Sequence, residues 1–460
     1  MIYTPMIKKA INILEEKQKG KKDIFGYPTF IHTFSTAERL TNEVEITVAL
    51  LFGVKGEINI DDLKNLGFSQ EILEPLSILY QDNSNYDNYI KNISQNEAAT
   101  NIMIAYLYHI IDFIDANDFD KGHINENNKN KDYLKYLLDY KTKKKRDVYK
   151  DSFFGFVVGD ALGVPLECTP RVELKNHPVN DMIGFRTHMM PPGTWSDDTS
   201  MTLAELDSIS EKEDIDYYDI MDKFVSWCRN NDYTGTGVFF DIGNTTKKAL
   251  TNYTLGNNPL DCGCSTINDN GNGSLMRMLP FVIYSIKNEL NEDDEVKLIN
   301  EASGITHNHE ISKLGCKIYC DIMKYLFNGK NIDEIIEIVS KKDYKQYYSL
   351  EAINAYKRIL DGSIKYAQEK DIISHGYVVS TLEAAIWSLY NSVDYSSAVL
   401  TAINLGGDTD TVAAVTGSLA GAYYGMIPTK WIENVSNIEL VDYLYNSFIE
   451  KLRNKDQKIK

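Results

Sequence analysis

The sequence has little of three features that would place it quickly: long apolar runs, an excess of basic residues, and cysteine. No run of about 18 apolar residues occurs, so no membrane span is expected. Lys8 and Lys9 come too early for the apolar core of a signal peptide, which makes cytoplasmic the expected location. The chain has 48 Lys and Arg against 66 Asp and Glu, a net charge of −18, which argues against a protein that binds nucleic-acid backbones.

Only six cysteines occur in 460 residues, and none precedes Cys168. This number excludes a disulfide scaffold. Residue types that could bind zinc are scattered through the second half at Cys262, Cys264, His307, His309, Cys316 and Cys320. Paired C-x-x-C knuckles are absent, so the pattern favours buried reduced thiols over a structural zinc site.

Alternating strand patterns are also scarce, and apolar residues recur at helical spacing on both sides of residue 147. We expect an all-α fold with a domain at 1–147 and a larger one at 148–460. Residues 117–131 are polar and rich in asparagine, which predicts a linker within about 116–147, with a short helix near 133–138. The basic run 141–146 is interpreted as a solvated junction, in preference to a nucleic-acid patch.

Acidic residues are concentrated in the larger domain, where residues 149–460 carry 44 acidic and 29 basic side chains. Gly193 leads into Trp195-Ser196-Asp197-Asp198-Thr199, followed by residues that suit a helix. Ser196, Asp197 and Asp198 are therefore predicted at a helix N-terminus, where anions are favoured. The stretch fits an ordinary N-cap as well as a cation site, because adjacent acids repel unless a cation neutralises them.

A second glycine-led turn has the same design in Gly406-Gly407-Asp408-Thr409-Asp410-Thr411. Small residues from Ala413 to Gly421 keep the helix that follows thin, so another helix can approach closely. If the two turns face each other, their carboxylates and hydroxyls offer hard oxygen ligands. Such ligands suit Mg²⁺ or Mn²⁺, with Ca²⁺ also possible, and do not suit zinc or copper.

Three further stretches carry chemistry. The segment 155–167 has glycines four apart, which permits close helix packing, and ends in Glu167, a candidate acid or base. The segment 270–277 is a glycine-rich turn whose backbone N–H groups can hold phosphate. His307 precedes another predicted helix, where a lone histidine is more often structural than functional.

These stretches, together with Asp241-Ile242-Gly243-Asn244-Thr245-Thr246, occur in an order that resembles the ADP-ribosylglycohydrolase family over residues 149–460. The resemblance implies an all-α fold with two Mg²⁺ or Mn²⁺ ions. The implied metal ligands are Ser196, Asp197, Asp198, Asp408, Asp410 and Thr411. It implies catalytic roles for Glu167 and Asp241. The implied substrate-binding residues are Gly271, Asn272, Gly273, Ser274, Leu275, Met276 and His307.

The implied reaction is hydrolysis at the anomeric ribose carbon of an ADP-ribosyl group on a protein or small molecule. A different class of function is open as well: a protein that binds ADP-ribose or a nucleotide signal without turnover. Retention of every acidic ligand favours the enzyme.

Residues 1–115 resemble the HD-type phosphohydrolases through segments around His32, Val48 and Asn101. Phe52 and Gly53 stand where that family has its His-Asp metal pair, and Tyr106 stands where a later Asp ligand is expected. Neither an aromatic ring nor a glycine binds Mn²⁺. The resemblance therefore implies a catalytically inactive domain that either binds a nucleotide or a partner or acts as a packing module, with His32 as a structural residue.

Overall fold

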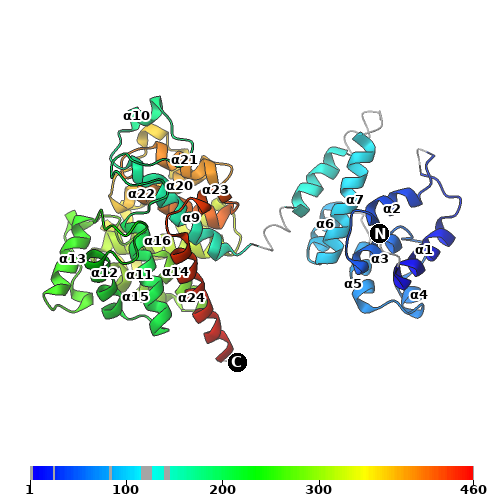
Figure 1. The fold of residues 1–460 in the computed structure, drawn as a ribbon, viewed down its shortest axis with the longest axis horizontal. Helices are drawn as coiled ribbons and strands as arrows, with labels where there is room; N and C mark the ends of the chain where they lie inside the picture. The colour runs from blue at the N-terminus through cyan, green and yellow to red at the C-terminus, as the bar shows by residue number, and fades with distance from the viewer. Residues whose placement is uncertain (1–3, 24–25, 82–84, 116–126, 139–145, 459–460) are drawn as a thin grey trace. The chain divides into compact units, whose positions relative to one another are not determined.

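The computed structural model describes residues 4–458, except 24–25, 82–84, 116–126 and 139–145 (Figure 1). The described residues form helices and isolated bridges without a strand, which confirms the all-α prediction. The chain divides into two compact units, Met1–Arg146 and Asp147–Lys460, each with its own hydrophobic core. Across the described ranges, no helix has the length and apolar character needed to cross a membrane.

The N-terminal unit is a cluster of short helices around a core of aliphatic side chains. Its helices are α1 (Pro5–Gln18), α2 (Phe30–Ala37), α3 (Glu43–Phe52), α4 (Ile60–Asn65), α5 (Gln70–Leu79), α6 (Tyr86–Ser94) and α7 (Glu97–Asp115). Residues 127–138 are helical too, and Leu134 and Leu137 are buried in this core. The predicted linker was therefore wrong for residues 127–131, because the helix anchored by those two leucines begins earlier. Residues 116–126 and 139–145 of the predicted linker, and with them most of the basic run, lie outside the described residues.

The positions where an HD-type site would need ligands are filled by packing contacts. The rings of Phe52 and Tyr106 meet edge to face, 5.9 Å between centroids. A Cβ on Gly53 would collide with the Thr33 side chain. His32 joins Asp23 (2.7 Å) to His109 (2.8 Å) in a chain of hydrogen bonds. In the described part of this unit, no three His, Cys, Asp or Glu side chains are placed to share an ion.

The C-terminal unit contains the longer helices and the larger core. Its helices are α9 (Val148–Gly163), α10 (Arg171–Asn176), α11 (Asp197–Lys212), α12 (Tyr217–Asn230), α13 (Asn244–Thr254), α14 (Leu279–Lys287), α15 (Glu292–Gly304), α16 (Glu310–Phe327), α17 (Ile332–Ser340), α18 (Leu350–Ala355), α19 (Lys357–Leu360), α20 (Val378–Tyr390), α21 (Tyr395–Asn404), α22 (Thr409–Tyr423), α23 (Thr429–Glu433) and α24 (Ile438–Lys458).

Helices α9 and α22 lie at the centre of this unit with their backbones in direct contact (Figure 1). A Cβ on Gly155, Gly159 or Gly163 would collide with the backbone of Gly417, Ala413 or Thr409 respectively. The order of these contacts shows that the helices are antiparallel, so the end of α9 lies at the start of α22. The predicted close approach of another helix to α22 is thus confirmed, and the partner is the glycine-bearing helix α9.

Replacing Gly159 with Ala is expected to lower the free energy of unfolding of the C-terminal unit by about 1–3 kcal/mol, because the rigid Ala413 carbonyl blocks the added methyl group. Gly243→Ala is the matched control, since its Cβ would find only the Thr246 hydroxyl, 3.8 Å away, and its φ is −60°. Thermal melts followed by circular dichroism measure both. Equal melting temperatures for the two variants would contradict the prediction.

Burial, with smaller contributions from His32 and Arg39, lowers the pKa of His109 from 6.5 to about 4. Because this pKa is lower in the folded state, the unfolded chain takes up a proton first as the pH falls. The N-terminal unit should lose up to about 3 kcal/mol of stability between pH 6.5 and 4. Urea unfolding of wild type and His109→Gln across this range tests it, and the pH slope should shrink in the variant. If the stability of the variant depends on pH as steeply as that of the wild type, the loss of stability does not come from His109.

Candidate active site

A cavity of about 870 Å³ opens in the C-terminal unit where α9 ends and α11, α13 and α22 begin. Most of the residues predicted for the site line it: Glu167, Asp197, Asp241, Gly271, Asn272, Gly273, Met276, His307, Asp408, Asp410 and Thr411. Segments that are up to 244 residues apart in the sequence, from Glu167 to Thr411, therefore meet in one place. This arrangement follows from the antiparallel packing of α9 and α22.

Ser196 is the N-cap of α11, as predicted, and its hydroxyl accepts the Asp198 N–H. Asp160 on α9 supports this turn from behind. Its carboxylate accepts the N–H of Ser196 (3.0 Å) and both the N–H and the hydroxyl of Thr199 (3.1 and 2.6 Å). Trp195, the residue before Ser196, is held in place because its indole N–H donates to the Tyr233 carbonyl. The first turn of α11 is thereby held in place by groups outside the helix.

The second glycine-led turn begins α22, with Asp408 as its N-cap. Gly406 and Gly407 have φ values of +70° and +80°, and a Cβ on either would collide with the backbone of Thr169 or Ser374. Only glycine satisfies both demands. The Asn272 amide donates to Asp408 (2.6 Å), and the Thr411 hydroxyl donates to Asp198 (3.2 Å). The second bond joins the two turns directly.

The two turns bring carboxylates together without enough donors to satisfy them. Asp160, Asp198 and Asp410 form one group in which an oxygen from each lies within 4.8 Å of the others, and Glu167, Asp408 and Asp410 form a second. One oxygen of Asp198 and one of Asp410 are buried with no hydrogen-bond partner. Burial is the largest cause that raises the pKa of Asp197, Asp198 and Asp410 well above the usual value, and the neighbouring acids add to it.

Buried, unsatisfied carboxylates of this kind fit a hard divalent cation, because Mg²⁺, Mn²⁺ and Ca²⁺ prefer oxygen ligands. Asp160 fits least well, since its oxygens already accept three donors. The two groups share Asp410, which is an arrangement suited to neighbouring ions. The acids of the first turn of α11 also lie where the helix dipole favours negative charge.

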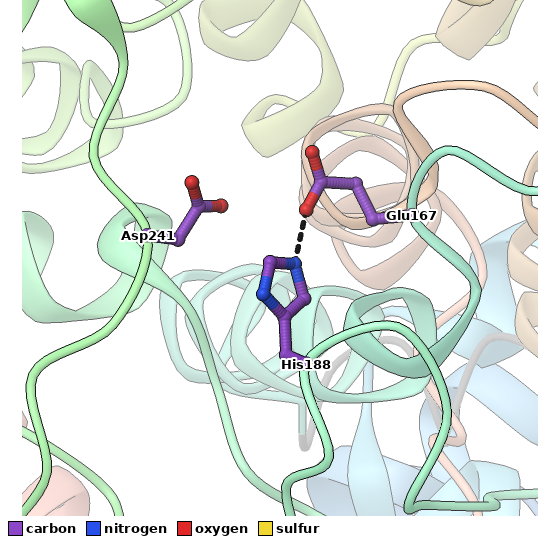
Figure 2. Close-up of side chains that lie close together, drawn as sticks. All are labelled: Glu167, His188 and Asp241. Atoms are coloured by element: carbon purple, nitrogen blue, oxygen red, sulfur yellow. Dashed lines mark hydrogen bonds and ion pairs between the residues drawn. The ribbon is translucent and has the colours of Figure 1, made fainter.

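Asp241 and Glu167 lie close together on two sides of His188 (Figure 2), with one oxygen of each acid and one ring nitrogen of His188 within 4.8 Å of one another. Glu167 follows a 3₁₀ turn (Val164–Leu166) at the end of α9. Asp241 has a left-handed backbone with φ of +56°, which is strained for a residue with a side chain. Burial raises the pKa of Asp241 to about 6, and the neighbouring Glu167 adds to the shift. A carboxyl group with this pKa can carry a proton close to neutral pH.

The glycine-rich turn contributes less than expected. Ser274 and Leu275 are not among the cavity-lining residues, and neither are Ser196 and Asp198 of the first turn. The Ser274 hydroxyl accepts a hydrogen bond from Ser303 (2.9 Å), and Leu275 packs in the core. His307 does line the cavity, and burial lowers its pKa to about 3, so its imidazole is neutral.

Other lining residues were missed by the sequence reasoning, among them His375, Gly376 and Arg171. The Gly376 carbonyl accepts the Asn272 N–H (3.0 Å), so the segment around it pairs with the glycine-rich turn. Arg171 gives its guanidinium to the carbonyls of Leu405, Glu369 and Ile372, and so fixes the loops of this wall. Neither segment has a helical period or a motif that would have marked it.

The cysteines take no part in a cluster of this kind. All six are free thiols, and Cys262, Cys316 and Cys320 are buried. Among the described residues, the groups placed to share an ion contain no cysteine.

Comparison with known proteins agrees with the motif order. The model of the ADP-ribosylglycohydrolase family matches residues 141–458. The chain belongs to this family. The prediction of an ADP-ribosylglycohydrolase is thus confirmed, and the HD-type resemblance of residues 1–115 stays a prediction.

Two relatives are both called ADP-ribosylarginine hydrolase Tri1. The protein from Serratia proteamaculans is 34% identical over 303 residues, which are 65% of this chain and 78% of that protein. The protein from Pseudomonas putida is 31% identical, over 68% of this chain and 80% of its own. A solved structure described as an ADP-ribosylglycohydrolase-related protein complex superposes with a TM-score of 0.56 at 29% identity, covering 66% of this chain and 98% of its own.

The unsatisfied carboxylates predict that Mg²⁺ or Mn²⁺ stabilises the protein. At 100 times the dissociation constant a single bound ion adds about 2.7 kcal/mol, visible as a higher melting temperature than in EDTA. Asp198→Asn should melt higher than wild type in EDTA, because one buried charge is gone, and should respond less to the ion.

The control is Asp333→Asn, which removes an exposed carboxylate paired with Lys365. This variant should keep the full response to the ion. A full response in Asp198→Asn as well would place the ion elsewhere.

Proposed function

We propose that the protein removes ADP-ribose from an ADP-ribosylated arginine by hydrolysing the bond between the ribose anomeric carbon and the guanidinium nitrogen. The observation that carries this proposal is the cavity in which both acidic turns meet Glu167 and Asp241. The acceptor is taken from the two relatives that are named ADP-ribosylarginine hydrolases. A cationic guanidinium also suits the part of the cavity that carries the carboxyl groups of Glu167 and Asp241.

The residues proposed to hold Mg²⁺ or Mn²⁺ are Ser196, Asp197, Asp198, Asp408, Asp410 and Thr411. Two ions there would supply Lewis acidity and a lower pKa for bound water. The remaining tasks fall to the chain's own residues: they hold the two turns in place, bind the diphosphate and move the protons. Asp160 and Asn272 hold the two turns in place through the hydrogen bonds described above.

The diphosphate is proposed to lie at the start of α13. Asn244, Thr245 and Thr246 line the cavity there, and the helix N-terminus attracts an anion. The hydroxyl of Thr246 is buried and has no hydrogen-bond partner among the described residues, which fits a donor kept for a ligand. Thr246 also lies beside Gly273, whose Cβ would approach its hydroxyl to 3.1 Å. The predicted glycine-rich turn therefore supplies one wall of the phosphate pocket.

Glu167 and Asp241 are proposed to move the protons. Water adds its oxygen to the anomeric carbon, and one of its protons passes to Glu167. The carbon–nitrogen bond breaks, and the departing guanidine nitrogen takes a proton from Asp241, whose pKa near 6 leaves it partly protonated. Two carboxyl groups in different environments can divide these roles.

Incubation of the full chain with Mg²⁺ or Mn²⁺ and an ADP-ribosyl-arginine peptide tests the proposal, with free ADP-ribose measured by chromatography. The wild type should release ADP-ribose, and Asp197→Asn with Asp198→Asn should lose at least about a thousandfold in rate. Asp333→Asn is the control that should keep the wild-type rate. The same assay with an ADP-ribosyl-serine peptide tests whether arginine is the acceptor.

The alternative class of function has its own outcome. If the wild type releases nothing from either peptide yet binds ADP-ribose in calorimetry, the chain is a binding protein and the hydrolase proposal is wrong.

A further inference from the structure

His188 lies beside the two proposed proton carriers, Glu167 and Asp241, although it is not among the cavity-lining residues and no sequence motif marks it. Its Nε2 is hydrogen-bonded to Oε2 of Glu167, and one ligand-type atom from each of His188, Glu167 and Asp241 falls within 4.8 Å of the others (Figure 2). Its ring also packs on Phe240, with centroids 5.1 Å apart. His188 therefore contacts both the Glu167 carboxylate and the segment that presents Asp241.

The loop that carries His188 is built against the backbone of Glu167. The Thr187 hydroxyl donates to the Glu167 carbonyl (2.7 Å), and the Thr187 N–H donates to the Pro165 carbonyl (3.1 Å). The Phe185 N–H donates to the Met190 carbonyl (2.7 Å), which closes the loop on itself. Two of these bonds thus tie the residue before His188 to the Glu167 segment, and the third closes the loop itself.

Strained backbone is concentrated at this group of three residues. Ten non-glycine residues of the described chain have positive φ, and four of them are Cys168, Phe185, Met189 and Asp241. Cys168 follows Glu167, while Phe185 and Met189 lie on either side of His188. Such conformations cost of order 1–3 kcal/mol each and persist where the surroundings enforce them, typically at functional sites.

The Glu167 carboxylate has few other means of staying in place. In the hydrogen bonds recorded for the described residues, its other side-chain contact is the weak one from the Cys168 thiol (3.8 Å). The nearby carboxyl groups, Asp241 and Asp408, repel it. Without the hydrogen bond from His188, the flexible side chain of Glu167 would rotate away from these two acids.

We propose that His188 is a positioning residue that holds the Glu167 carboxylate against the repulsion of the neighbouring acids and aims it at the reacting water. This inference rests on the proposed hydrolase function. This role for His188 also explains why the chain maintains a strained loop beside Glu167.

The test compares His188→Ala, His188→Gln and the control His177→Ala, in which the exposed histidine that ends α10 is replaced. With the ADP-ribosyl-arginine peptide and Mg²⁺, His188→Ala should lower kcat about tenfold to a hundredfold, with KM changed less than about twofold. His188→Gln should recover most of kcat, because its amide N–H can donate to Glu167. His177→Ala should match the wild type.

Crystal structures of wild type and His188→Ala supply a readout that does not depend on turnover. The Glu167 carboxylate should leave its place opposite Asp241 in the variant. If it stays, or if kcat is unchanged in an active enzyme, the inference is overturned while the hydrolase function stands. If the wild type is inactive on both peptides, the hydrolase function fails, and the position of Glu167 alone decides whether His188 holds it.

Discussion

The contact between α9 and α22 is the constraint on which the rest of the C-terminal unit depends. Glycines on α9 and small residues on α22 let the two backbones touch, with no side chains between them. Because the helices are antiparallel, the last turn of α9 meets the first turn of α22. Four acidic groups of the site are placed by this one contact: Asp160 and Glu167 come from the α9 side, and Asp408 and Asp410 from the α22 side.

The same contact creates an electrostatic problem that the fold does not solve by itself. Carboxylates from α9, α11 and α22 are buried together. Among the described residues, Arg171 is the one lysine or arginine that lines the cavity, and its guanidinium is engaged by carbonyl oxygens. The unsatisfied oxygens of Asp198 and Asp410 show where compensation is missing. A structural ion pair elsewhere in the unit, Arg277 with Glu205, is fully buried yet matched in charge. The acidic turns differ from it in having no such cationic partner among the described residues.

Sequence reasoning succeeded where a local pattern has a local physical cause. A glycine pair before Asp408, a serine before two acids, and glycines four apart on α9 each predict their structure within a few residues. It failed where the cause is tertiary. Asp160 lies in an apolar helix and gives no local sign that it caps α11, and His188 lies in a loop without period. Ser274 and Leu275 belong to a recognisable motif, but only packing decides which of its residues face the cavity.

The acid excess of the chain has two different physical meanings within one unit. Most of the 44 acidic residues after position 148 are spread over the helices, many in pairs with lysine such as Lys341 with Glu337. Exposed pairs of this kind contribute little to stability. Asp197, Asp198 and Asp410 at the two turns are buried instead, and burial raises the pKa of each. Composition could not separate these two groups of acids. Net charge counts every carboxylate equally, whereas the energetic cost of each one depends on how deeply it is buried. The distinction became visible only when the backbone contact of α9 with α22 showed which acids share one cavity.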